Sequence, residues 1–205
     1  MNKRTAVQIV FCTTSLLCAL DARASLITFD NLLAPSTFAH GTALSEEYAV
    51  QGVHFQGSGM VLNTYSNFEG VPWTYTRDRS NFLAFNSNVG VAPPETILFD
   101  NAINFFKWDF AGSSGDAHLT AYLGNTLVGN NSISATFGVW NEMSLNAAAF
   151  DKVVFSVGNT DPHFVVDNLT YTPRITSVPL PASLWLFVPA TLGLFGAAWR
   201  KRPSH

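Results

Sequence analysis

The part of the chain from Ser25 to Thr172 is a succession of short segments rich in β-branched and aromatic residues. Glycine, proline, asparagine and aspartate separate these segments, a pattern that is typical of short β-strands joined by turns. No stretch long enough for a helix repeats its apolar residues with a helical period. Consecutive strands without intervening helices pack as two antiparallel sheets. The sequence therefore predicts an all-β, antiparallel β-sandwich.

The strands can be placed by their alternation of apolar and polar residues. About ten are expected, and Gly124-Asn125 between two of them is a two-residue hairpin signal. The stretches 33–45 and 63–80 have no clear period and are expected to be loops. The segments with strand character are 25–32, 48–55, 61–62, 81–85, 96–99, 103–110, 118–123, 126–128, 132–139, 142–145, 152–157 and 163–172.

The end of the chain has a different composition. An uncharged run at 183–199 lies between the motif Val178-Pro179-Leu180-Pro181-Ala182 and the basic cluster Arg200-Lys201-Arg202. As an α-helix, residues 182–199 would be about 27 Å long, which is enough to cross a thin hydrocarbon core. Cations directly after an apolar run are typical of the cytoplasmic end of a membrane helix. The sequence predicts a single transmembrane helix, and the alternative is a buried helix of a globular domain.

This order of motif, apolar run and basic cluster resembles the PEP-CTERM family of bacterial sorting tails, in its V-P-L-P-A variant. Leu180 stands where the motif that names the family carries Glu, and three residues, 203–205, follow the basic cluster. The resemblance implies that the tail is a substrate of exosortase, a membrane-embedded, cysteine-protease-like enzyme of Gram-negative bacteria that make exopolysaccharide. The resemblance implies how the protein is sorted, by way of a transient anchor in the inner membrane, and it implies no activity.

The start of the chain predicts export. Lys3 and Arg4 precede a mostly apolar run at 5–20, and small residues precede Ser25 at the positions that signal peptidase reads. We expect cleavage between Ala24 and Ser25, with an uncleaved anchor as the alternative. Basic residues at both ends place the stretch between them on the far side of the inner membrane. The expected parts are a signal peptide at 1–24, an exported domain at 25–172, a linker at 173–177 and a sorting tail at 178–205.

Charge and cysteine content exclude several kinds of site. Between Ser25 and Ser177 there are five Lys or Arg and 13 Asp or Glu, a formal charge of −8. Because phosphates are bound by Lys and Arg, nucleic acid and anionic lipid are not expected as partners. Both cysteines, Cys12 and Cys18, lie in the expected signal peptide. The exported region therefore has no disulfide, catalytic cysteine or cysteine-bound metal.

The last two expected strands carry a second resemblance. The segment 150–155, followed by 164–171 with Asp167-Asn168 inside it, resembles the closing strands of galactose-binding-like jelly rolls, which occur in many carbohydrate-binding modules. In several such modules an aspartate of the closing strand and an acid of the first strand help to bind a structural Ca²⁺. The resemblance implies a jelly-roll-like sandwich with a candidate Ca²⁺ site at Asp30 and Asp167. The alternative is that Asp167-Asn168 caps a strand end through side-chain-to-backbone hydrogen bonds.

No motif in the sequence indicates catalysis. The serines of 57–59 and 112–115 lack the spacing of a nucleophile elbow, and neither a zinc-protease helix motif nor a phosphate-binding loop occurs. The histidines of the exported region are scattered one per segment, at His40, His54, His118 and His163. We therefore predict that the domain is not an enzyme.

The stretch 72–79 is the best candidate for a recognition surface. It concentrates Trp73, Tyr75, Arg77 and Asp78, and sugars are bound by aromatic rings and by charged or amide groups on loops. The alternative is that Trp73 and Tyr75 close one end of the core.

Together these features predict an exported, exosortase-sorted, non-catalytic β-sandwich protein that associates with exopolysaccharide. The expected processing partners are signal peptidase and exosortase. The expected final location is the cell envelope or the extracellular space, with a membrane-anchored precursor. Two alternatives are a structural matrix or surface component without a specific ligand, and a polysaccharide hydrolase or lyase.

Overall fold

The structure is a computed structural model in which residues 23–63, 81–112, 115–158 and 163–174 are described. Strands and short 3-10 turns form the regular structure of these residues, and no α-helix occurs among them. Within the same ranges, no helix is long and apolar enough to span a membrane. The strands are β1 (Ser25–Ile27), β2 (Val53–Phe55), β3 (Met60–Leu62), β4 (Phe82–Asn86), β5 (Glu95–Gly112), β6 (Gly115–Leu123), β7 (Thr126–Ala135), β8 (Asn141–Val157) and β9 (His163–Pro173). The 3-10 turns are η1 (Phe38–His40), η2 (Ala49–Gln51) and η4 (Ser87–Val89).

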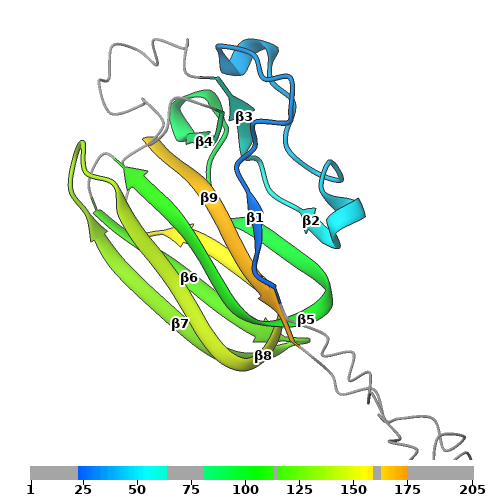
Figure 1. The fold of residues 1–205 in the computed structure, drawn as a ribbon. Coiled ribbons are helices and arrows are strands. Elements are labelled where there is room, and N and C mark those ends of the chain that lie inside the picture. The colour runs from blue at the N-terminus through cyan, green and yellow to red at the C-terminus, as the bar shows by residue number, and fades with distance from the viewer. Residues whose placement is uncertain (1–22, 64–80, 113–114, 159–162, 175–205) are drawn as a thin grey trace, which may run out of the picture. The chain divides into compact units, whose positions relative to one another are not determined.

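Two antiparallel layers share the long strands β5 and β8 (Figure 1). In the first layer the order is β7, β6, β8, β5, β2, formed by residues 152–157 of β8 and 95–99 of β5. In the second layer residues 141–146 of β8 pair with β5, and β5 pairs with β9. The other edge of β9 pairs with β4 and with β1, and β3 extends from β4. The predicted all-β antiparallel sandwich is thus present.

Aromatic rings fill the space between the two layers. Phe155 of the first layer is fully buried, and its ring centroid lies 5.0 Å from that of Trp108 in the second. Phe85 and Phe110 lie 5.6 and 5.8 Å from the same ring. Edge-to-face contacts of this kind add to the free energy that burial of the rings already supplies. Phe155 is therefore a central contact between the layers.

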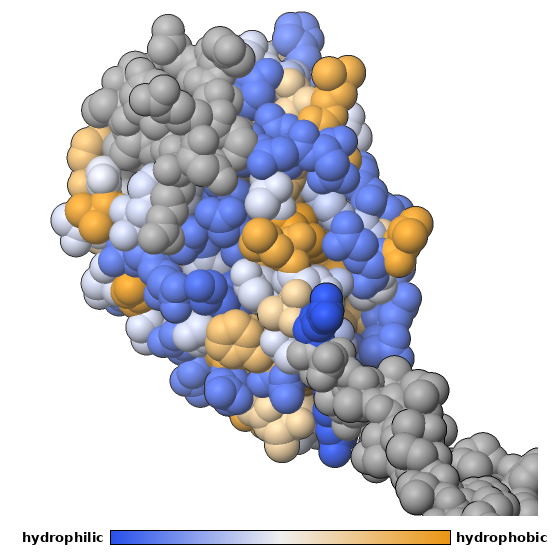
Figure 2. Space-filling model, in the orientation of Figure 1, coloured by the Kyte–Doolittle hydropathy of each residue, from blue (hydrophilic) through white to orange (hydrophobic). Residues whose placement is uncertain are grey.

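The outward face of the second layer is partly buried as well. A smaller apolar cluster lies there, with Phe38 and Trp140 packed against its edge. The outward-facing Asp109, on β5 of the same layer, is only 4% exposed. In the view of Figure 2, by contrast, hydrophobic residues lie in small separate groups among hydrophilic ones. The buried members of the cluster are Leu62, Phe82, Ala84, Ala111 and Val165.

Several predicted elements match the structure. Gly124-Asn125 joins β6 to β7, and Leu123 pairs with Thr126 across this two-residue turn. The side chain of Asp151 accepts the backbone N–H of Gly124, at 2.9 Å, and so anchors the hairpin. The predicted strands at 61–62, 81–85 and 163–172 correspond to β3, β4 and β9 within one or two residues.

Other boundaries were wrong. The strand predicted at 48–55 is a 3-10 turn followed by β2, because Gly52 has a left-handed conformation that interrupts the extended chain. The strand predicted at 25–32 ends at Ile27, and Phe29 has a φ of 61°. Other predicted strands are joined in the structure. The segments 96–99 and 103–110 both lie in β5, and 142–145 and 152–157 both lie in β8. The segments 126–128 and 132–135 both lie in β7, which ends at Ala135, so residues 136–139 are not strand.

Replacing Phe155 with Ala should lower the free energy of unfolding by about 3–5 kcal/mol, because it opens a cavity between the layers. Phe105→Ala is the matched control, since Phe105 is only partly buried on the outward face of the second layer. Urea denaturation of both variants measures the difference. An equal, small effect of both substitutions would contradict the central role of Phe155.

Candidate functional site

The outward face of the first layer is open to solvent. Strand register places five side chains in one row across its five strands, namely Leu127, Tyr122, Lys152, Leu98 and His54. A second row contains Asn130, Thr120, Val154 and Thr96, and a third contains Ser132, His118 and Ser156. Each of these side chains is partly or fully exposed. No further layer of the described residues covers this surface, which we call the open face.

Hydroxyl, amide and imidazole groups dominate the open face. Lys152 and Asp116 are charged side chains of this face, and Asp116 accepts a hydrogen bond of 2.5 Å from the Ser134 hydroxyl. Lys152 Nζ lies 4.6 Å from the ring centroid of Tyr122, within the range of a cation–π interaction. The open face therefore combines one partly exposed aromatic ring with hydrogen-bonding groups, most of which are neutral, and a few apolar side chains.

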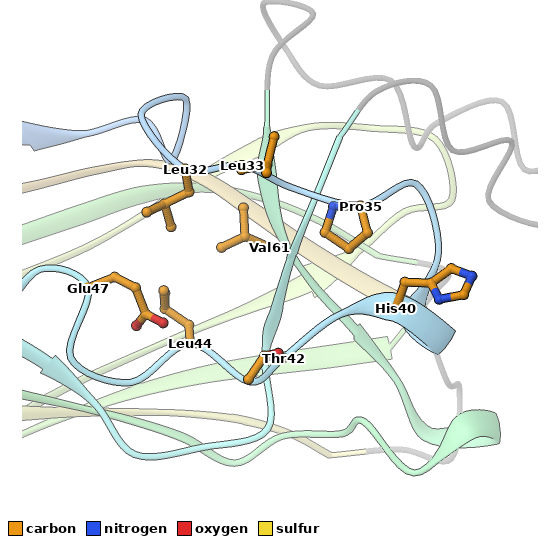
Figure 3. Close-up of a pocket in the computed structure, with 8 residues that line it drawn as sticks. All are labelled: Leu32, Leu33, Pro35, His40, Thr42, Leu44, Glu47 and Val61. Atoms are coloured by element: carbon orange, nitrogen blue, oxygen red, sulfur yellow. The ribbon is translucent and has the colours of Figure 1, made fainter.

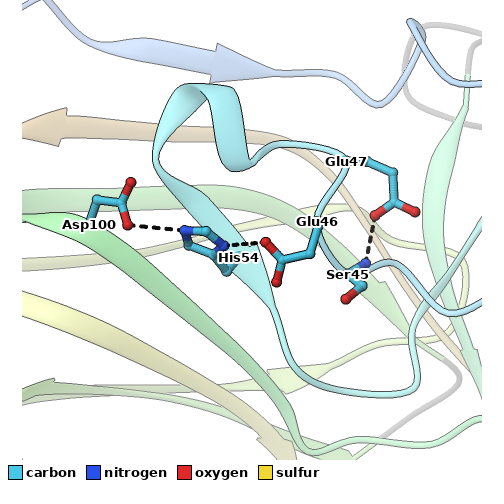
Figure 4. A network of polar contacts seen from close by, with 5 residues as sticks. All are labelled: Ser45, Glu46, Glu47, His54 and Asp100. Atoms are coloured by element: carbon cyan, nitrogen blue, oxygen red, sulfur yellow. Dashed lines mark hydrogen bonds and ion pairs between the residues drawn. The ribbon is translucent and has the colours of Figure 1, made fainter.

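A polar network lies where the row ends at His54 (Figure 4). Its Nδ1 is 2.6 Å from Glu46 Oε2, and its Nε2 is 3.1 Å from Asp100 Oδ1. Hydrogen bonds to these carboxylates raise the pKa of His54, and so favour the imidazolium form. Because carboxylates occupy both ring nitrogens, His54 is not placed to act as a base toward a hydroxyl nucleophile.

Glu95 is a second anchor of the same part of the chain. Its carboxylate is fully buried and accepts the backbone N–H of Gly59 at 3.0 Å. A Cβ at Gly57 would collide with this carboxylate, so the approach requires glycine there. Desolvation raises the pKa of Glu95 to about 7, although backbone N–H groups act in the opposite direction. The carboxyl group thus fastens the segment after β2 to the start of β5.

The described residues also form a pocket of ≈ 260 Å³ (Figure 3). Leu44 and Val61 supply buried apolar wall, while Leu33 is fully exposed. Glu47 and His40 lie at opposite ends of the lining in Figure 3. Glu47 already accepts the backbone N–H of Ser45, at 2.7 Å. The pocket is lined mainly by loop residues, and its Glu47 and His40 side chains do not converge in Figure 3.

The candidate Ca²⁺ ligands are engaged with the backbone. Asp30 is exposed and accepts the N–H of Asn81 at 2.8 Å. Asp167 is fully buried and accepts the N–H of Asn168 at 2.7 Å, a bond of the kind that the capping alternative requires. Asp167 lies opposite Asp109 in the β5–β9 register, and Asn168 donates to Asp109 at 3.0 Å. Among the described residues no three His, Cys, Asp or Glu side chains form a metal-binding group. A Ca²⁺ site completed by backbone carbonyls stays a prediction.

The other sequence-predicted sites lie outside the described residues. These are the recognition stretch with Trp73, Tyr75, Arg77 and Asp78, the motif at 178–182 and the basic cluster at 200–202. The predicted cleavage position is described, and Ser25 is the first residue of β1. Cleavage there stays a prediction.

Sequence reasoning missed the open face. The sequence does contain a relevant pattern, in which these outward positions alternate with apolar ones. They are His118, Thr120 and Tyr122 in one strand and Lys152, Val154 and Ser156 in another. Alternation assigns each set to one face of its own strand, but it does not reveal which strands are neighbours. The row through Tyr122, Lys152 and His54 depends on that pairing.

Comparison with known proteins gives distant structural similarity. No family model and no curated protein matches the chain. The K2 adhesin domain of Lys-gingipain is 15% identical, with a TM-score of 0.46 over 73% of this chain and 99% of that domain. The K1 adhesin domain of Lys-gingipain from Porphyromonas gingivalis W83 is 12% identical, with a TM-score of 0.46 over 75% of this chain and 99% of that domain. The carbohydrate-binding module TmCBM61, solved with β-1,4-galactotriose, is 9% identical, with a TM-score of 0.41 over 65% of this chain and 100% of the module. Similarity at this level assigns neither a ligand nor an activity to the chain.

The raised pKa of Glu95 predicts a pH-dependent stability. The folded protein holds the proton up to about pH 7, whereas the unfolded chain releases it near 4.5. Stability contributed by this group is therefore complete below pH 4.5 and is lost as the pH rises toward 7, by about 3 kcal/mol in total.

Urea unfolding of the full chain at pH 5 and pH 8 should show this loss in the wild type and a smaller one in Glu95→Gln. His54 also has a raised pKa, which acts in the same direction, so the difference between the two proteins isolates Glu95. Glu142→Gln is the control, because Glu142 is 54% exposed. A Glu95→Gln protein with the wild-type pH dependence would show that Glu95 is not the titrating group.

Proposed function

We propose that the chain is an exported, non-catalytic β-sandwich protein that associates with extracellular polysaccharide through its open face. The observation that carries the proposal is the row through Tyr122, Lys152 and His54 on a layer that no other described element covers. A polysaccharide chain is long and rich in hydroxyl groups, and a broad surface of donors and acceptors can bind several of its sugars at once.

The chemistry of the open face supports a sugar ligand over other polymers. Thr96, Thr120 and Ser156 offer hydroxyl groups, and Asn130 and His118 offer further donors and acceptors. The partly exposed Tyr122 ring supplies an apolar surface with a polar tip. With a formal charge of −8 between Ser25 and Ser177, the exported region would repel nucleic acid.

The absence of an enzymatic role is part of the proposal. Two observations support this part of the proposal. Glu46 and Asp100 occupy both ring nitrogens of His54, and Glu95 is buried beneath backbone groups. Neither group is therefore placed to transfer a proton to or from a substrate. Release of reducing ends from polysaccharide incubated with the purified protein would contradict this part of the proposal.

Tyr122→Ala should weaken retention of the protein by polysaccharide at least tenfold, a loss of about 1.4 kcal/mol or more. The measurement is retention by the polysaccharide of the producing cells, combined with a melting curve for each variant. Phe105→Ala is the matched control, because it removes a partly buried ring from the outward face of the other layer. Equal retention of wild type and Tyr122→Ala, with both proteins folded, would exclude the open face as the binding surface.

Export and sorting belong to the same proposal. Signal peptidase would release the mature protein at Ser25, and an exosortase would act at the motif 178–182, leaving the protein in the envelope or outside the cell. Pro179 and Pro181 support this, because prolines lack backbone N–H groups and would resist joining the predicted helix that follows.

Intact mass spectrometry of envelope protein from native cells should therefore find a species that begins at Ser25 and ends near Ala182. Replacing Arg200, Lys201 and Arg202 with neutral residues should leave the tail unprocessed, because the orienting charges are gone. A wild-type species extending from Ser25 through His205 would show a permanent anchor instead of a sorting signal.

A further inference from the structure

Strand β7 is the outermost strand of the first layer. Its inner edge pairs with β6 over the whole range from Thr126 to Ala135. Among the described residues no strand pairs with its outer edge. Half of the backbone N–H and C=O groups of an edge strand point away from its partner. Over ten residues, β7 therefore presents a long row of groups that another strand can pair with.

The sequence of β7 lacks the features that usually protect an edge. Natural edge strands carry lysine, proline, inward-pointing charges or bulges, or are very short. Among the described strands, the edge strands β1, β2 and β3 have three residues each. From Gly124 to Asn141, by contrast, there is no Asp, Glu, Lys, Arg or Pro. One register shift interrupts β6–β7 pairing, and it lies near the turn, at Tyr122. The remainder of β7 is a regular strand.

The charge distribution favours a second copy of this chain as the occupant. The exported region carries −8, so two copies repel each other over most of their surface. The stretch 124–141 carries no charged side chain, so two copies can approach there with little repulsion. Antiparallel pairing about the middle of β7 puts the two Asp116 carboxylates at opposite ends, separated by more than the Debye length of about 8–10 Å. An identical strand also supplies matching hydroxyl and amide side chains, since Asn130, Ser132 and Ser134 face outward.

We propose that β7 is a self-association edge, at which two copies of the protein pair their β7 strands antiparallel about a twofold axis near Asn130–Ser132. Such an interface is isologous, because the same segment of each copy contacts the other. The first layers of the two copies then form one continuous sheet, with their open faces on the same side. The pairing requires no glycan.

Disulfide trapping tests the register directly. Residues directly opposite in an antiparallel pair have Cα atoms about 4.5–5.5 Å apart, within the span of a disulfide. The experiment uses a chain in which Cys12 and Cys18 are changed to Ser. If the twofold axis passes through residue 130 or residue 132, two copies of Asn130→Cys or of Ser132→Cys, respectively, form a disulfide with each other. If the axis passes through Asn131, the disulfide forms only in a mixture of the two variants. Mild oxidation of the purified full chain should cross-link one of these samples at least ten times faster than Thr120→Cys. Thr120 is a matched control, because it lies opposite Asn130 on β6, on the same face but one strand inward.

A second experiment avoids cysteine chemistry. Asn130→Lys/Ser132→Lys adds like charges that face each other across the axis, and light scattering should show at least a tenfold rise in the dimer dissociation constant. Thr120→Lys adds its charge one strand inward and should leave association nearly unchanged. Wild-type protein that is monomeric at all concentrations, or Thr120→Cys cross-linking as fast as the β7 cysteines, would overturn the proposal. Neither measurement contains polysaccharide, so failure here and failure of the proposed glycan binding are distinguishable.

Discussion

The pairing of β5 with β8 is the constraint on which the rest of the structure depends. It begins at Glu95 and Phe155 in the first layer and continues to Phe110 and Asn141 in the second. Register shifts between Leu98 and Phe105 let both strands turn from one layer into the other, as bulges do in bent strands. The remaining strands then add to the edges of this pair: β6 and β2 in the first layer, β9 in the second. The aromatic core lies between the two halves of the same pair, which explains why rings from both layers meet at Phe155.

The segment from Ser45 to Gly59 is attached to this framework in a different way. β2 has three residues, so backbone pairing with β5 is brief. Side chains supply the additional attachment. His54 bridges Glu46 and Asp100, and Glu95 accepts a backbone N–H from the turn that follows β2. Both anchors weaken as the pH rises, since His54 loses its proton and the buried Glu95 acquires a charge. The attachment of this edge of the open face is therefore expected to weaken as the pH rises.

The sequence predicted the fold class well because alternation and turn residues are local signals. Gly124-Asn125 specifies its hairpin from two residues, and the apolar run before Asp167 identifies the closing strand. Boundaries failed where local pattern and tertiary structure disagree. Asp100-Asn101 looks like a turn, yet the chain stays extended there because β5 must continue into the second layer. The open face was not predictable, since Tyr122 and His54 become parts of one row only through three intervening strand pairings.

The open face and the β7 edge belong to the same layer, and this has a consequence for binding. Pairing of two β7 strands about an axis perpendicular to the sheet would place both rows of Tyr122, Lys152 and His54 on one side of a continuous surface. A polysaccharide repeats its binding unit along its length, so one chain could contact both copies. The second contact is then intramolecular, and overall affinity can exceed that of one face by about 10²–10⁴-fold without any new type of contact. An uncharged edge strand left unpaired is prone to uncontrolled association. If the face binds glycan and the edge pairs two copies, as proposed, the edge would supply the multivalency that raises the affinity of a weak single face.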